Sequence, residues 1–545
     1  MGTTRTQGIA RRNRHCVRFT CLVQAGFALL LAACAVGPDF SPQPAPIADK
    51  YIGTNNRSIK SGDKEYSDWW KSFHDPVLNR LIEDAYNQNL TLLAAGTKVL
   101  QARAALGIAI GFEYPQLQQG TGSLIYNRSS AATPLAAPNA KPAFFWTNAL
   151  AVQAAWELDF WGKFRRGVES ADGAYLASIA SYDDVLVSLL GDVAATYVGI
   201  RTTEELLGIA RANVTAQQKI LNIAQAKYRG GGTSELDVFQ AQNVLEQTQA
   251  VIPQLTNQLR QGEDALCILL GIPPQPLGAL LARSRGRIPY PPATVTVGIP
   301  ADLLRRRPDI HAAELLALAQ SAQIGVAESD LYPAISITGT FGGAASTANG
   351  HNLGQIFTHT GMTYAAGPSF QWNILNYGQI TNNVRLQDAT LQQLLVNYQN
   401  LVLAAQQQVN DAISTFLQSR AQVGDLRGSV QAARNALNAA ADQYQQGATN
   451  FTTVLVSEQN LFQAESSLGV ASGNVALGLV ALYRALGGGW QIRVDSNFVT
   501  AATVEQMRAR TSWGHVLPPI SEPQPPAPSL PSPADVRPTI RLPEW

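Results

Sequence analysis

Two long stretches of the chain carry apolar residues at helical spacing. They run from Lys163 to Tyr228 and from Gln379 to Tyr444, are rich in Ala and Leu, and contain no proline. Apolar residues that recur every three to four positions predict amphipathic α-helices. At about 1.5 Å per residue, each helix would be ~100 Å long, which is far longer than a globular domain is wide. Such helices need packing partners along their whole length.

A glycine-containing turn follows each long stretch. The first reads Tyr228-Arg229-Gly230-Gly231-Gly232-Thr233-Ser234, and the second reads Tyr444-Gln445-Gln446-Gly447-Ala448-Thr449-Asn450. A glycine just after a helix suits a left-handed C-cap, and Ser suits the N-cap of the helix that follows. We therefore expect two antiparallel helical hairpins whose tips point the same way.

Two further stretches, 144–158 and 361–375, have the periodicity of strands. Apolar residues take every second position, so each strand would have one apolar face. Trp146 and Trp156 would lie ~25 Å apart along a membrane normal, which matches the apolar band of outer-membrane barrels. Pro368 removes a backbone donor and therefore predicts a bulge. The alternative for these strands is a two-sheet sandwich.

Partner strands are predicted at 334–341 and, from a weaker pattern, at 117–126, which gives four strands per chain. Four strands cannot close a barrel, and an open sheet edge cannot face lipid. Three chains would supply twelve strands and room for a lumen, whereas two would supply eight, a number usually filled by side chains. The strands and helical hairpins therefore predict an α+β membrane protein whose chains associate through their sheet edges.

The two halves of the chain repeat one another. A constant offset of 216 positions links several aromatic residues and glycines, namely Trp156 with Trp372, Gly162 with Gly378, Tyr228 with Tyr444, Gly231 with Gly447, and Gly271 with Gly487. Before the strands the offset is 218, which pairs Tyr114-Pro115 with Tyr332-Pro333. Register held over so many positions predicts an internal two-fold repeat of helix, two strands, long helix, turn and helix.

The charge balance argues against a nucleic-acid partner. Basic residues number 40 and acidic residues 39, and five of the arginines precede Cys34, where there is no acidic residue. The remainder has 35 basic residues against 39 acidic ones and so lacks the cationic footprint that nucleic acid requires. Charged residues make up only 14% of the chain, so much of its surface must be polar and uncharged.

The N-terminal segment has the pattern of an export signal. A basic stretch is followed by an apolar run from Leu22 to Ala33 and then by Cys34. Small residues before a cysteine resemble the lipobox of bacterial lipoproteins, which implies that Cys34 carries diacylglycerol and palmitate as a covalent anchor. Ala35 instead of Asp implies delivery to the outer membrane. The alternative is an ordinary secretory signal cut near Ala33.

The sequence offers little for catalysis or for metal binding. No phosphate loop, nucleophile elbow or zinc motif is present, so we expect no enzyme, no metal and no cofactor besides the lipid anchor. His311 and Glu314 have the spacing of a metal pair, but exposed helix surface is the better interpretation without a third ligand. Cys267 lies in an apolar stretch and is expected to be an inert core residue.

Taken together, several segments resemble the TolC-like outer membrane factors, and in particular the NodT-type efflux lipoproteins. The matching segments are Cys34–Phe40, Trp69-Trp70, Phe73–Ile82, Trp156–Gly162, Leu304–Ile310, Glu328–Pro333 and Gly367–Trp372. The resemblance covers the chain from Cys34 to about Trp490. It implies a homotrimer in outer-membrane lipid with a twelve-stranded outer-membrane β-barrel, helical hairpins that form a tunnel in the periplasm, and docking to an inner-membrane pump through a periplasmic adaptor.

The resemblance also implies that the hairpin tips form a gate and contact the adaptor. The residues concerned are Tyr228, Gly231, Glu235, Asp237, Tyr444, Gly447, Thr449 and Thr453. Family members often have carboxylates or a bonding Arg where this chain has Thr449, Thr453 and Val456, so the second tip is neutral. Glu235 and Asp237 could form a weaker acidic ring, or could simply stabilise the start of a helix. We expect a gate held by neutral hydrogen bonds and packing.

The expected organisation has six parts. They are a signal peptide (1–33), an equatorial N-terminal segment (34–75), a first repeat (76–271), a proline-rich equatorial linker (272–307), a second repeat (308–487), and an equatorial segment with a proline-rich tail (488–545). The implied function is an exit duct for drugs or other small molecules in a tripartite system. The alternatives are a type I protein-secretion duct and a periplasmic structural lipoprotein without a pore.

Overall fold

The structure is a computed structural model that describes residues 35–54, 56–62, 66–130, 142–284, 286–348, 351–493 and 496–517. Cys34, where lipid attachment is expected, the expected signal peptide and the end of the proline-rich tail lie outside these residues.

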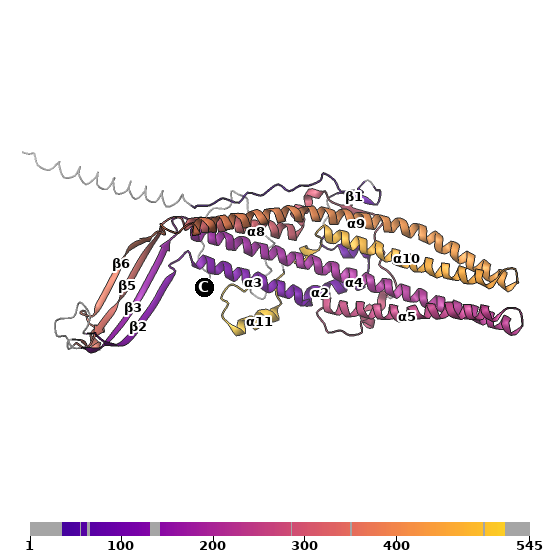
Figure 1. Ribbon diagram of the computed structural model, residues 1–545, viewed down its shortest axis with the longest axis horizontal. Helices are drawn as coiled ribbons and strands as arrows, with labels where there is room; N and C mark the ends of the chain where they lie inside the picture. The colour runs from indigo at the N-terminus through magenta and orange to yellow at the C-terminus, as the bar shows by residue number, and fades with distance from the viewer. Residues whose placement is uncertain are drawn as a thin grey trace, which may run out of the picture.

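Four helices form two long antiparallel hairpins (Figure 1). Helices α4 (Lys163–Arg229) and α9 (Gln379–Gln445) have 67 residues each, and the return helices α5 (Glu235–Leu269) and α10 (Phe451–Ala485) have 35 each. The ends of α4 and α9 agree with the sequence prediction to within one residue. The turns pass through left-handed glycines as expected, with φ of 69° at Gly231 and 76° at Gly447.

Shorter helices complete the helical wall nearer the sheet. Helices α3 (Leu90–Gly111) and α8 (Pro308–Ser329) have 22 residues each; α3 packs on α4, and α8 packs between α4 and α9. Farther from the sheet, α5 takes the place of α3 and α10 takes the place of α8 (Figure 1). Among the described helices, α4 and α9 alone therefore run the whole length of the wall.

One antiparallel sheet contains all four predicted strands, in the order β2-β3-β5-β6. The strands are β2 (Leu117–Arg128), β3 (Phe144–Leu158), β5 (Ala334–Ser346) and β6 (Met362–Gln371). The predicted bulge at Pro368 is wrong, because Pro368 lies opposite Ile337 in continuous register. Strand β6 is an edge strand of the sheet, where a missing backbone donor is tolerated.

Smaller elements surround the middle of the wall and enclose the main core. There, Trp69 stacks on Tyr483 of α10 with ring centroids 5.3 Å apart. The helical elements are η1 (Trp69–Phe73), α2 (Pro76–Gln88), α6 (Gly278–Leu281), η2 (Ala282–Ser284), η3 (Pro300–Asp302), α7 (Leu303–Arg306), η6 (Trp490–Arg493) and α11 (Ala501–Arg510). Two short strands, β1 (Ile59–Ser61) and β4 (Val295–Val297), pair in parallel, and η5 (Leu353–Phe357) lies between β5 and β6.

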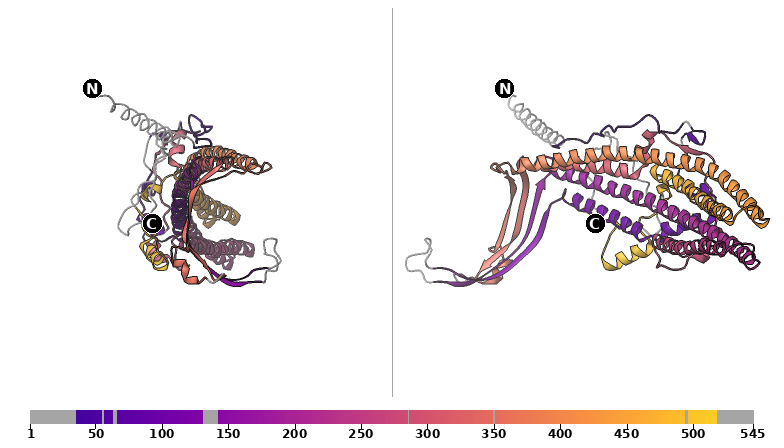
Figure 2. Two further views of the ribbon diagram at one scale, coloured as in Figure 1. Left: turned by 90° about the vertical axis from the view of Figure 1, so that its left-hand side faces the viewer. Right: turned by 45° about the vertical axis from the view of Figure 1, so that its right-hand side comes forward.

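Viewed along the long axis, the helices form a curved wall (Figure 2, left). The N-terminal segment and α11 lie on the convex side of this wall, and the other side is concave. The sheet extends from one end of the wall, and both hairpin tips lie at the opposite end (Figure 1).

Candidate functional site

One face of the sheet is apolar and uncovered. On this face Val152, Phe341 and Tyr364 form a row across three strands. Their exposed fractions are 62%, 59% and 81%. Other exposed members of this face are Leu124, Tyr126, Trp146, Leu150, Ile337 and Phe370. Burying such a face stabilises a protein by about 25 cal/mol per Å², so leaving it in water would be costly.

The opposite face of the sheet is polar. The next row contains Gln119, Gln153 and Thr340, and the Gln119 side-chain amide donates to the Gln153 oxygen at 3.2 Å. Within the described ranges no second sheet packs on the apolar face, so the sandwich alternative is wrong. One face of the sheet therefore suits lipid and the other suits water.

Aromatic residues gather at both ends of the sheet, as the sequence predicted. At the end away from the helices, the Tyr126 and Trp146 ring centroids are 5.0 Å apart. At the junction with the helices, Trp161 stacks on Tyr332 at 4.6 Å, and the Trp372 indole donates to the Leu331 carbonyl at 3.0 Å. Aromatic rings with a polar edge favour the boundary between lipid and water.

By length and composition alone, three helices of the described chain could also cross a membrane. They are α3, α4 and α10. In α4 and α10, however, 61% and 56% of the most apolar window is already buried inside the chain. The apolar residues of α4 and α10 are largely used in packing between helices, whereas only 33% of the α3 window is buried and the apolar face of the sheet is uncovered.

The segment that follows Cys34 is fixed at the junction between sheet and helices. The Arg166 side chain, which is buried, donates to the carbonyls of Val36 and Gly37 at 3.3 and 3.2 Å and forms an ion pair with Asp39 at 2.7 Å. Arg166 also pairs with Glu169 at 2.8 Å, and these carboxylates raise the pKa of its guanidinium against the opposing effect of burial. Any lipid on Cys34 would therefore start from a fixed place.

The two hairpin tips are in contact with each other. Lys227 places its ammonium group 4.1 Å from the centroid of the Tyr444 ring and donates to the Tyr444 backbone carbonyl. Tyr444 also packs on Phe451, with centroids 5.1 Å apart, and burial raises the pKa of the Tyr444 phenol. An apolar cluster beneath the tips joins the hairpins and includes Leu221, Val244, Ala440 and Val454.

The predicted tip residues divide into buried and exposed groups. Tyr444 is buried, with 7% of it exposed, whereas Tyr228 is 44% exposed. Gly231 and Gly447 form the turns, as described above. Ser234 has the N-cap position of α5, but its hydroxyl makes no capping bond.

The acids at the first tip lie in the first turn of α5. Asp237 accepts a hydrogen bond from the Thr233 hydroxyl, which is a local contact at the helix start, while Glu235 is exposed. At the second tip, Thr449 donates to Thr453 at 3.2 Å, and Thr453 donates its backbone N–H to Asn450 at 3.1 Å. The contacts inside the second turn are therefore neutral hydrogen bonds, whereas the contact between the two tips involves the charged Lys227.

Some important residues were not identified from the sequence. Lys227 could have been found, because the position 216 residues later is Gln443 and the charge occurs in only one copy. Arg166 gave no signal, since its partner Asp39 is 127 positions away. His311 and Glu314 are half-buried rather than exposed, and no group of three metal-ligating residues occurs in the described ranges.

Comparison with known proteins agrees with this architecture. The family model "Outer membrane efflux protein" matches residues 81–272 and 299–488. Nodulation protein T of Rhizobium leguminosarum bv. viciae is 29% identical over 496 residues, covering 91% of this chain and 98% of the relative. The pyoverdine export outer membrane protein OpmQ of Pseudomonas putida is 30% identical over 478 residues, covering 87% and 98%.

Solved structures agree as well. The outer-membrane channel OprN superimposes with a TM-score of 0.78 at 30% identity, covering 84% of this chain and all of that one. Of these proteins, OpmQ is named as an export protein and OprN as a channel. Because the family model matches more than half of the residues, the chain belongs to the outer membrane efflux protein family.

Proposed function

We propose that this outer membrane efflux protein is the exit duct of a tripartite system, in which three copies form one channel. Small molecules would reach it from an inner-membrane pump through a periplasmic adaptor. The observation that carries the proposal is the sheet, which has an uncovered apolar face and continues into a curved helical wall. Such a sheet supplies one third of a lipid-facing barrel.

The open sheet edges support the trimer. Among the residues that the structure describes, strands β2 and β6 each have a neighbouring strand on one side only. Backbone groups in lipid must be paired, so these edges require other chains. Three copies would give the twelve-stranded barrel and a tunnel bounded by the concave sides of three walls. The proposed internal repeat explains why one chain contributes two hairpins of strands and two of helices.

The names of relatives indicate the class of cargo. OpmQ is described as exporting pyoverdine, TtgI of Pseudomonas putida as a toluene efflux protein, and CusC of Escherichia coli as part of a cation efflux system. These names favour small molecules over the proteins of type I secretion. The duct itself would be passive and would need no cofactor.

The hairpin tips are the proposed gate and adaptor contact. Leu236 and Phe239, in the first turns of α5, are 60% and 58% exposed, so the first tip offers apolar surface to a partner. Glu235 and Asp237 add acidic groups in the same first turn of α5, while the side chains of Thr449 and Thr453 at the second tip are neutral.

The N-terminal anchor completes the proposal. Diacylglycerol and palmitate on Cys34 would start beside the aromatic residues at the junction of sheet and helices, because Arg166 fixes the residues that follow. The proposed domain boundaries remain those expected from the sequence, with the equatorial segments around the middle of the wall.

The test is to purify the full-length protein from outer membranes, measure its mass in detergent, and record currents in planar bilayers. We expect three chains per particle and discrete ion conductance. A monomer, or a trimer with no conductance even after tip-opening substitutions, would support the structural lipoprotein instead. Copurification with a protein-secretion ABC transporter would support type I secretion.

A further inference from the structure

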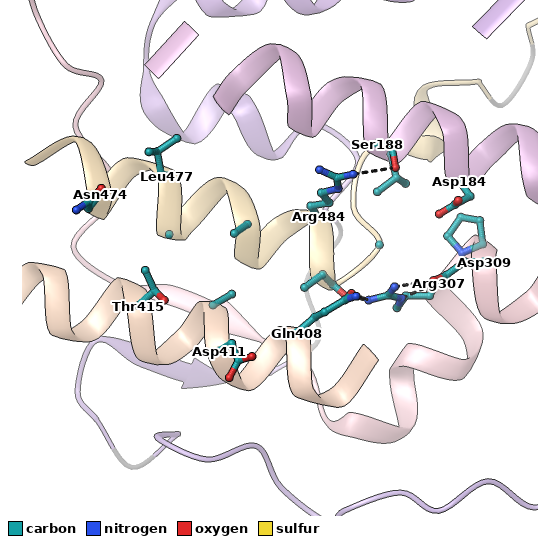
Figure 3. A pocket seen from close by; sticks show the side chains of 17 residues that line it. Asp184, Ser188, Arg307, Asp309, Gln408, Asp411, Thr415, Asn474, Leu477 and Arg484 are labelled. Carbon is teal, nitrogen blue, oxygen red and sulfur yellow. Dashed lines mark hydrogen bonds and ion pairs between the residues drawn. The ribbon is translucent and has the colours of Figure 1, made fainter. Parts of the chain in front are cut away.

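A cavity of about 670 Å³ lies in the helical wall where α10 ends and α8 begins (Figure 3). Helices α4 and α9 run past this junction on either side. The cavity exists because two half-length helices meet end to end without filling the space between the long ones. Its lining therefore comes from four helices that are far apart in the sequence.

The cavity opens toward the concave side of the wall. On α9, Gln406 and Asn410 bond to the N-terminal segment, which lies on the convex side. At 100° per residue, the cavity-lining residues Asp411 and Thr415 lie on the opposite face of α9. If the concave side is the lumen, as the proposed function requires, then passing cargo meets this cavity.

The basic side chains of the cavity are already paired. Arg307 holds both Asp309 oxygens at 3.0 and 2.6 Å and also donates to Gln408 at 2.8 Å. Arg484 forms an ion pair with Asp192 at 2.8 Å. Their charges are therefore balanced before any ligand arrives.

Two carboxylates of the cavity remain unbalanced. Asp184 on α4 and Asp411 on α9 lie on opposite sides of it (Figure 3). Neither forms an ion pair with a basic side chain of the described residues. Burial raises the pKa of Asp184, and the nearby Asp309 carboxylate raises it further, against the opposing effect of the Arg307 and Arg484 charges.

The remaining lining suits an amphiphilic molecule. Val187 and Leu477 provide apolar contact, whereas Thr415 and Asn474 provide polar groups without net charge. A volume of this size lies within the range of cavities that hold small organic ligands. Excess negative charge combined with apolar surface selects against anions.

We propose that this cavity binds organic cations, with the positive charge balanced by Asp184 and Asp411 and the apolar body against Val187 and Leu477. It would be a stopping point for cationic cargo in the wall of the duct. The inference rests on the proposed function, because that function makes the concave side the lumen.

The experiment uses the full-length detergent-solubilised protein and calorimetric titration with benzyltrimethylammonium. The matched anion is benzenesulfonate. We expect saturable binding of the cation only, weakened about tenfold, or 1.4 kcal/mol, by Asp184→Asn with Asp411→Asn. High salt should weaken binding as well. The control is Asp425→Asn, which removes an exposed carboxylate from a similar face of α9 farther toward the tip.

A second variant distinguishes loss of the binding site from misfolding of the first variant. Leu477→Trp fills the cavity without changing its charge and should also abolish binding, while the thermal melt of each variant reports its folding. Equal loss in Asp425→Asn, equal binding of benzenesulfonate, or no saturable binding would overturn the inference. Currents of the same preparation in planar bilayers test the proposed function separately. Conductance without cation binding would overturn only this inference, whereas absence of conductance would count against the proposed function.

Discussion

The ammonium group of Lys227 lies 4.1 Å from the centre of the Tyr444 ring and donates to the Tyr444 carbonyl. Lys227 belongs to the last turn of α4, and Tyr444 belongs to the last turn of α9. One side chain therefore ties together the tips of the two hairpins. A cation at this place also compensates the negative end of the α9 dipole.

We predict that Lys227→Met opens the duct. A charge-assisted hydrogen bond with a cation–π contact contributes about 2 kcal/mol, which would shift a closed-to-open equilibrium about thirty-fold. Single-channel recordings should show larger or longer openings. The control is Lys219→Met, which removes an exposed lysine two turns earlier on α4. Equal effects of both substitutions would contradict the role of Lys227.

A buried acid lies in the seam between the hairpins. Glu458 on α10 is 1% exposed, and its Oε1 has no hydrogen-bond partner among the described residues. Gln217, a buried amide on the neighbouring α4, likewise has an oxygen without a donor. Burial raises the pKa of Glu458 to about 7, so near neutral pH its carboxyl group is partly protonated.

This pKa predicts a falling stability with rising pH. The folded chain holds the Glu458 proton more tightly than the unfolded chain, whose pKa is near 4.5. The stabilisation is fully present below pH 4.5 and is lost as pH rises through about 7, a total of about 3 kcal/mol. The melting temperature of the wild-type protein should fall as pH rises from 5 to 8, and this dependence on pH should be weaker in Glu458→Gln. Exposed Glu246→Gln should keep the wild-type slope.

We predict that Arg166→Met releases the N-terminal segment. Substitution leaves the Val36 and Gly37 carbonyls without this donor and removes the ion pair to Asp39, at a cost of about 1–3 kcal/mol. A spin label at Ser41 should become more mobile. Asp39→Asn should have a smaller effect, since the Asp39 side chain is 91% exposed. An unchanged spectrum in Arg166→Met would refute the clamp.

The proposed anchor predicts that Cys34→Ser abolishes palmitate incorporation. Metabolic labelling and intact mass would measure this directly, because the acyl chains add a fixed mass to the mature chain. Cys34→Ser chains that have not assembled should also be extracted from membranes more readily, since each buried CH₂ of the lipid contributes about 0.8 kcal/mol to anchoring. Palmitate found on the Cys34→Ser protein would mean that the lipid is attached to a residue other than Cys34.

Sequence periodicity predicted the long helices and β3 closely because each depends on local patterns of apolar residues. The bounds of α4 and β3 illustrate this, since both follow the sequence pattern to within a residue. By contrast, β5 continues to Ser346, beyond the predicted 334–341, and β6 ends at Gln371, before the predicted end at 375. The error at Pro368 arose because strand order, which makes β6 an edge, is not a local property.

The functional side chains were harder to predict because their partners are distant in sequence. Arg166 meets residues from the N-terminal segment, and the cavity joins α4 to α8, α9 and α10. Only the fold brings such groups together. The tips were located correctly because glycine turns are local, but the contact of Lys227 with Tyr444 needed the packing of two hairpins.

Since only α4 and α9 cross the middle of the wall without a break, they are the sole stiff members connecting tips to sheet in the described chain. The shorter helices beside them begin or end at that level. We expect bending to concentrate at that level, so the tips can splay while the membrane end keeps its shape. A duct built this way can change its aperture without straining the bilayer around it.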